Sequence, residues 1–245
     1  MSSRYLLEIA CNSAMSAVAA QQGGANRVEL FENLEQGGTT PSSGSIAVAR
    51  DYLQIPLFVL IRPRPGDFHY GALETELMLR DIAHCRQLGC DGVVIGALSA
   101  DAEIDMPLCR ELVSAAGPMD ITFHRAFDAA RDLPTALEQI ADLGIKRILS
   151  SGGRASAAEG SAVLSSLAEQ AGSRLALMAG AGLSAQNVAE VALKTGCVQL
   201  HASAKGRQRS AMRYQNPWLQ GLDNDWIQTQ STAVAALREA LDQLG

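Results

Sequence analysis

The chain has 245 residues, of which 47% are hydrophobic, 19% charged and 4% aromatic, and its formal net charge is −6 at pH 7. This composition excludes a disordered or collagen-like chain, and no apolar run reaches the roughly 18 residues that a transmembrane helix needs. The mild acidity argues against nucleic acid or an anionic membrane surface as a partner. The first residues do not resemble a secretory signal, so we expect a cytoplasmic protein.

Short aliphatic or β-branched runs alternate with stretches of helical apolar spacing along the whole chain. Strict alternation of strands and helices predicts a parallel sheet, and eight units favour a closed (β/α)8 TIM barrel over residues 1–245. An open doubly wound sheet is the alternative, but no phosphate or dinucleotide loop follows the first strand. The predicted strands begin at Tyr5, Arg27, Leu57, Gly92, Ile121, Arg147, Leu175 and Cys197.

The segment 205–227 breaks this period, because it is longer than an ordinary strand–helix connection. It contains Met212, Tyr214, Trp218 and Trp226, which are costly to leave in water, and this argues against disorder. We expect this segment to form a lid over the barrel or a contact with a second subunit. A packed surface loop is the alternative.

Charged and imidazole side chains lie near the C-terminal ends of several predicted strands, where buried parallel strands are usually apolar. By strand alternation, Glu8 and Glu29 point away from the side that faces the helices. Burial beside other charges shifts pKa values in the way that acid–base catalysis requires. Glu8, Glu29, His124 and His201 are therefore candidate catalytic residues, although each alone could simply satisfy hydrogen bonds or charge inside the barrel.

A second set of residues predicts a site for a small anionic metabolite. Arginines end the third and fifth predicted strands, and small residues follow the sixth, seventh and eighth. Backbone N–H groups in such turns suit an anion, and many barrels bind phosphate after strands seven and eight. The candidate substrate-binding residues are Arg62, Arg64, Arg125, Asp128, Ser151, Gly180, Gly182 and Ser203.

Several motifs closely resemble the CutC family, whose members are called copper homeostasis proteins. They occur in the family's order between about residue 6 and about residue 216: NRVELFENLEQGGTTPS, IRPRPGDFHY, DGVVIGAL, ITFHRAFD, LSSGG, MAGAG and SAMRYQN. The resemblance implies a cytosolic TIM barrel, generally oligomeric, which we take as a homodimer or homotetramer. It also implies a link to copper tolerance or Cu(I) binding, with copper as the bound ion.

The candidate ligands for copper are an incomplete match to that family. Cu(I) prefers thiolate or thioether ligands, and the family's candidate cysteines end strands one and two, where this chain has Ala10 and Phe31. Cys11 is adjacent to the first of these positions, but alternation turns it toward the helices. The candidate metal ligands are accordingly His124, His201 and Cys11.

Three functions remain open from the sequence. The first is copper handling, with Met178 as a further sulfur ligand. The second is an enzyme acting on a small carboxylated or phosphorylated compound, in which Arg62 holds the anion, a glutamate acts as base and a histidine shuttles a proton. The third is a structural oligomer that binds neither ligand. A carboxylate–histidine site for a hard divalent ion is a lesser alternative.

Overall fold

Eight parallel strands close into a barrel in this computed structural model, which describes residues 4–218, 220–222 and 224–244. Each strand pairs with the next one along the chain, and β8 pairs with β1. The predicted TIM barrel is therefore confirmed, and every predicted strand begins within two residues of an observed one. The strands are β1 (Leu6–Cys11), β2 (Arg27–Leu30), β3 (Leu57–Leu60), β4 (Gly92–Ile95), β5 (Asp120–Phe123), β6 (Arg147–Ser150), β7 (Ala176–Gly180) and β8 (Gln199–Ala202).

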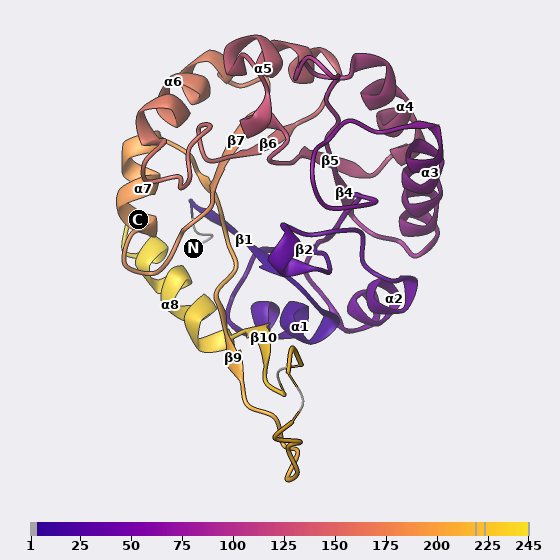
Figure 1. The fold of residues 1–245 in the computed structure, drawn as a ribbon. Helices are drawn as coiled ribbons and strands as arrows, with labels where there is room; N and C mark the ends of the chain where they lie inside the picture. Colours follow the sequence, from indigo (N-terminus) through magenta and orange to yellow (C-terminus); the bar gives the residue numbers. More distant parts are fainter. Residues whose placement is uncertain (1–3, 219, 223, 245) are drawn as a thin grey trace.

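The helices form a ring around this barrel (Figure 1). They are α1 (Ala14–Gln22), α2 (Ser43–Tyr52), α3 (Ala72–Gln87), α4 (Met106–Ala116), α5 (Leu133–Asp142), α6 (Ser161–Ala171), α7 (Val188–Thr195) and α8 (Ser231–Asp242), with short 3-10 turns η1 (Leu34–Gln36) and η2 (Phe127–Ala129). Ser13 and Ser42 cap α1 and α2 by accepting backbone N–H groups of the first turn, which fixes where each helix begins. Among the described residues, we find no helix with the length and apolarity needed to cross a membrane.

The hydrophobic core has two parts. The larger part lies between barrel and helices, where strand residues such as Leu7 and Ile9 are fully buried. A smaller cluster of Phe31, Phe58, Leu60 and Val94 is separate from it. Phe58 reaches across to β4, where a Cβ at Gly92 would lie 2.3 Å from its ring, so only glycine leaves room there. Beside this cluster, the barrel interior holds polar side chains such as Glu8, Arg27 and Arg147.

All five cysteines are buried free thiols. Burial raises the pKa of Cys109 to about 12 and raises that of Cys11 further. Cys11 belongs to the core cluster next to the helices, and its Sγ lies 3.4 Å from the carbonyl oxygen of Ile9. These thiols behave as small hydrophobic side chains.

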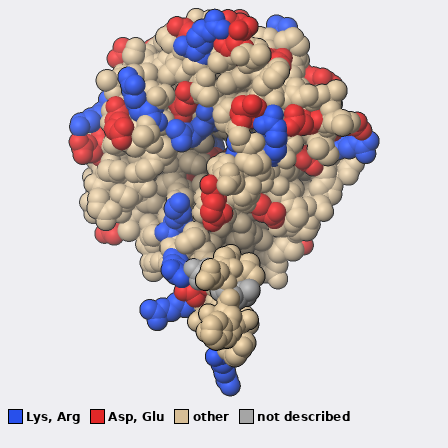
Figure 2. Space-filling model, in the orientation of Figure 1, with Lys and Arg blue, Asp and Glu red and all other residues tan. Residues whose placement is uncertain are grey.

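An arm, defined here as residues 205–218, 220–222 and 224–229, follows β8. Its two ends form strands β9 (Lys205–Gln208) and β10 (Trp226–Thr229), which pair in antiparallel fashion. The described residues between them extend away from the ring of helices (Figure 1), and basic side chains lie at the edge and tip of this extension (Figure 2). The strand pair directs the chain outward from the ring of helices, and a lid over the barrel stays a prediction. A contact with a second subunit stays a prediction.

We predict that the arm makes the chain self-associate, because Tyr214 is 72% and Trp218 is 89% exposed and large apolar side chains are costly to leave in water. In sedimentation equilibrium, the wild type is expected at twice the 25.9 kDa chain mass or more. A Tyr214→Ser/Trp218→Ser variant should shift toward the monomer. The matched control replaces two exposed leucines outside the arm, Leu73 and Leu193, with serine, and its mass in solution should stay that of the wild type. A monomeric wild type would contradict the prediction.

Candidate functional site

A cavity of about 390 Å³ opens where the barrel strands end, a volume that suits a small-molecule ligand. Figure 2 shows a small hollow near the middle of the ring, with basic groups at its edge. The polar lining consists of Glu29, Arg62, His124, Arg125, His201, Ser203 and Lys205. The apolar lining consists of Phe31, Leu34, Leu60, Phe68, Leu149 and Leu183. Each set combines residues from strands and loops that are far apart in the sequence.

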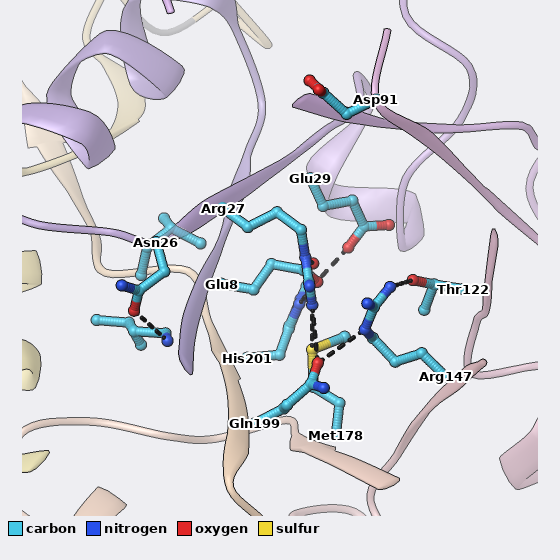
Figure 3. A network of polar contacts seen from close by, with 12 residues as sticks. Glu8, Asn26, Arg27, Glu29, Asp91, Thr122, Arg147, Met178, Gln199 and His201 are labelled. Carbon is cyan, nitrogen blue, oxygen red and sulfur yellow. Dashed lines mark hydrogen bonds and ion pairs between the residues drawn. The ribbon is translucent and has the colours of Figure 1, made fainter. Parts of the chain in front are cut away.

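The imidazole of His201 is held by Glu8, which is fully buried beside it (Figure 3). Nδ1 of His201 lies 2.8 Å from Oε1 of Glu8, and Nε of Arg27 donates to Oε2 of the same carboxylate. Burial alone would raise the pKa of Glu8, but Arg27 and His201 outweigh it and lower the pKa to about 2. Glu8 therefore remains a carboxylate and fixes the ring. Glu8 does not line the cavity and contacts His201 behind it, so a direct catalytic role of Glu8 stays an untested prediction.

Glu29 faces the other nitrogen of His201, with Oε2 3.5 Å from Nε2. Burial raises the pKa of Glu29 to about 7; the positive charge of His201 opposes this shift and the negative charge of Glu8 adds to it. The pKa of His201 is raised, because its hydrogen bond to Glu8 and the two carboxylate charges outweigh burial. Glu29 can thus both accept and release a proton near neutral pH, as a general acid–base group must.

His124 is a neutral hydrogen-bond donor on the wall of the cavity. The backbone N–H of Ala126 donates to its Nδ1 at 3.0 Å, and its ring packs on Phe68 with centroids 5.1 Å apart. Burial, helped by the charge of Arg62, lowers the pKa of His124 to about 3. Since Nδ1 accepts, Nε2 carries the proton. Nε2 is buried and has no hydrogen-bond partner among the described residues.

Two arginines absent from the predicted site fill the barrel interior near Glu8 (Figure 3). Arg27 and Arg147 both donate to Oε1 of Gln199, at 3.1 and 2.7 Å, and both stack on the ring of Phe58. Arg147 also donates to the hydroxyl of Thr122 at 3.0 Å. Within this layer, Arg27 supplies positive charge that helps to keep Glu8 ionised.

Asp128 and Ser151, predicted to bind substrate, instead bind each other. Oδ1 of Asp128 accepts the Ser150 hydroxyl at 2.6 Å and the Gly153 N–H at 3.0 Å, and Oδ2 accepts the Ser151 N–H at 3.0 Å. Arg125 pairs with the same carboxylate at 2.7 Å. Arg125 lines the cavity, but Asp128 and Ser151 do not. The carboxylate of Asp128 stabilises the turn after β6, because it accepts hydrogen bonds from several groups of that turn at once.

Replacing Asp128 with asparagine should lower the free energy of unfolding by about 1–3 kcal/mol, because an amide can no longer accept all these donors. Urea denaturation followed by circular dichroism measures this. The matched control is Asp101→Asn, an exposed residue whose carboxylate lies 3.5 Å from the guanidinium of Arg131, and its effect should stay within about 0.5 kcal/mol. Equal effects of the two changes would contradict the role of Asp128.

Four further predicted substrate-binding residues differ in where the structure places them. Arg64 pairs with Asp67 at 2.9 Å and with Glu74 at 2.5 Å, so its own loop satisfies it outside the cavity. Gly180 acts as a spacer, since a Cβ there would lie 2.5 Å from Leu149. Gly182 and Ser203 line the cavity, and their part in substrate binding stays a prediction.

The predicted metal ligands His124, His201 and Cys11 do not converge. Among the described residues, the group that could hold one ion is Glu8, Glu29 and His201, whose ligand atoms lie within 4.8 Å of one another. Cys11 faces the helices, and the sulfur of Met178 accepts from Arg27 at 3.4 Å. This set offers oxygen and nitrogen but no sulfur, so it does not fit Cu(I).

Comparison with known proteins gives the family. The sequence model of the CutC family matches residues 5–206. The chain belongs to the CutC family. A CutC family protein from Chromobacterium violaceum is 51% identical over 243 residues, covering 97% of this chain and 98% of that protein. One from Xanthomonas campestris pv. campestris is 48% identical over 238 residues, covering 97% and 98%.

A crystal structure of CutC from Streptococcus agalactiae, whose name links it to copper homeostasis, has a TM-score of 0.78 and 33% identity. The match covers 81% of this chain and 98% of that one. The resemblance seen in the motifs is therefore confirmed, and the TIM barrel is shared with a solved member of the CutC family.

Proposed function

We propose that this CutC family barrel is an enzyme that moves protons on a small molecule bound in the cavity, with Glu29 as the acid–base group. The observation that carries the proposal is the position of Glu29: it lines the cavity, and its pKa is raised to about 7 by burial. A catalytic acid or base works best when its pKa is near the working pH. Two carboxylates with separated pKa values, here Glu8 and Glu29, are typical of acid–base sites.

The ionised Glu29 would accept a proton from a C–H or O–H bond of the substrate, whose electron pair stays on the substrate. The protonated carboxyl would then return a proton to a neighbouring atom. His201, fixed by Glu8, contributes positive charge beside the carboxylate and holds its orientation. Phe31 and Leu60 provide an apolar surface for the carbon skeleton.

Solvent deuterium exchange tests this proposal. The full chain is incubated in D₂O with a panel of 2-hydroxy acids, 2-oxo acids and sugar phosphates, and the loss of C–H signals is followed by proton NMR. The wild type should exchange at least one compound, and Glu29→Gln should lose this exchange. The control Glu35→Gln, an exposed residue outside the cavity, should keep it. No exchange of any compound by the wild type would overturn the proposal.

Copper handling is the activity suggested by the name of the Streptococcus agalactiae relative. Because Glu8, Glu29 and His201 offer no sulfur ligand, we predict that the reduced chain does not compete with a chromophoric chelator for Cu(I) under anaerobic conditions. His124→Ala and His201→Ala should behave like the wild type in this titration. Tight one-to-one binding that is lost in His201→Ala would contradict the prediction and favour copper as cargo.

A further inference from the structure

Positive charge exceeds negative charge in the barrel interior. Among the described residues, the buried charged side chains other than histidine are Glu8, Glu29, Arg27, Arg62 and Arg147. Glu8 is matched by Arg27, and Glu29 carries only part of a negative charge near pH 7. A buried charge is unfavourable unless an opposite charge compensates it. The barrel interior therefore carries a net positive charge that one or more bound anions would compensate.

Arg62 and Arg147 are the buried arginines without an ion pair among the described residues, and of the two Arg62 lines the cavity and is 6% exposed. Backbone carbonyl oxygens hold its guanidinium in place: Nη1 donates to Gln36 at 3.1 Å and Gly38 at 2.7 Å, and Nη2 donates to Gly66 at 2.8 Å. These neutral acceptors position the group without cancelling its charge. No Asp or Glu among the described residues forms an ion pair with it.

His124 adds a free donor beside this charge. The guanidinium of Arg62 lies 5.0 Å from the ring centre of Phe68, and the His124 ring packs on the same phenyl group. The Nδ1 edge of His124 is occupied by the backbone at Ala126 and packs against Gly96. Its Nε2–H is therefore the donor left for a ligand, and it is buried without a partner. A buried donor with no partner costs stability unless a ligand accepts from it.

We propose that Arg62 and His124 form a subsite for the anionic group, a carboxylate or a phosphate, of the molecule on which Glu29 acts. This inference rests on the proposed function. Arg62 at the end of β3 supplies the charge, and His124 at the end of β5 donates one hydrogen bond. Glu29 and His201 come from β2 and β8, so the substrate would lie across the barrel mouth between the two pairs.

Anion-dependent thermal unfolding of the full chain tests the subsite. The midpoint temperature is measured by circular dichroism at pH 7 and constant ionic strength, with inorganic phosphate, acetate or uncharged acetamide as probes. We expect phosphate, acetate or both to raise the midpoint, and acetamide to leave it unchanged. Arg62→Met should weaken the apparent affinity at least tenfold, whereas the matched control Arg64→Met should keep the wild-type affinity.

Two other variants keep the test decisive if Arg62→Met does not fold. Arg62→Lys retains the charge and should retain part of the shift, and His124→Phe keeps the ring packing but should weaken anion binding several-fold. A shift with phosphate alone would assign a phosphate group, and one with acetate alone a carboxylate. No shift with either anion, or a shift that persists in both Arg62→Met and His124→Phe, would overturn the proposal.

The two proposals can fail separately, because anion binding does not require the proton-transfer group. Glu29→Gln should keep the anion-induced shift while losing deuterium exchange. Anion binding without exchange in the wild type would leave the subsite standing and overturn the proposed function. Exchange without anion binding would do the opposite.

Discussion

Replacing Arg27 with methionine is expected to lower the free energy of unfolding by about 3–5 kcal/mol at pH 7, since it leaves the carboxylate of Glu8 buried without its partner. Methionine retains most of the apolar stem of the side chain, so the loss reports mainly on charge. Urea denaturation followed by circular dichroism gives the value. Arg80→Met is the matched control, because Arg80 pairs with Glu76 at the exposed surface, and its effect should be at most about 1 kcal/mol.

Two further measurements separate charge from packing at this site. In Glu8→Gln/Arg27→Met, the lone charge is gone, so part of the lost stability should return. The pKa of Glu8 is lowered to about 2 in the folded chain from its ordinary 4.5. The stability that this carboxylate contributes is therefore present above about pH 4.5 and is lost as the pH falls toward 2. An equal cost for Arg27→Met and Arg80→Met would contradict the role of the buried pair.

Glu29→Gln is expected to stabilise the chain above pH 7 while abolishing deuterium exchange. The pKa of Glu29 is raised from 4.5 to about 7 in the folded state, so the unfolded carboxyl releases its proton first as the pH rises. Stability is thus fully present below about pH 4.5 and is lost as the pH rises through about 7. Glutamine never ionises, so the variant should be more stable by about 2–3 kcal/mol at pH 8.

The pH dependence gives this prediction a sharp signature. Unfolding curves of Glu29→Gln and the wild type should nearly coincide at pH 4.5 and separate steadily toward pH 8. Glu103→Gln, an exposed control, should follow the wild type at every pH. A Glu29→Gln variant that is less stable than the wild type at pH 8 would show that the carboxylate is favourably paired and not poised for proton transfer.

The barrel was predictable because its pattern is repeated and local. Runs such as the one beginning at Leu57 are short and aliphatic, helical spacing follows each of them, and the closed order then follows from regular alternation. The arm was not predictable in the same way. Lys205–Gln208 and Trp226–Thr229 have no apolar alternation, and they become strands only because they pair with each other.

The site was predictable where alternation alone decides which way a side chain points. Glu8 and Glu29 were placed inside the barrel on this basis, and the structure agrees. Strand alternation also places Arg27 on the same face as Glu29. A charged residue at the first position of a strand is, however, usually expected at the protein surface. The length of its side chain carries the guanidinium inward.

The spacing of residues in the sequence could not reveal which charged side chains form ion pairs or hydrogen bonds within the loops. Arg62 and Arg64 are two residues apart, yet one lines the cavity and the other folds back on Asp67 and Glu74. Asp128 was likewise indistinguishable from a ligand-binding acid, because its partners come from the turn after the next strand. Which local groups capture a charged side chain depends on loop conformation, which the composition of the loop does not fix.

The buried cysteines make it possible to follow local opening of the barrel by thiol labelling. A thiol reacts with a maleimide as the thiolate, and the pKa values of Cys11, Cys109 and Cys197 are all raised by burial. Labelling must therefore wait until the surrounding structure opens. Cys11 ends β1 and Cys197 just precedes β8, so these two report on the seam where the barrel closes, while Cys109 in α4 reports on the opposite wall. The order in which mass spectrometry finds them modified would show where the ring breaks first.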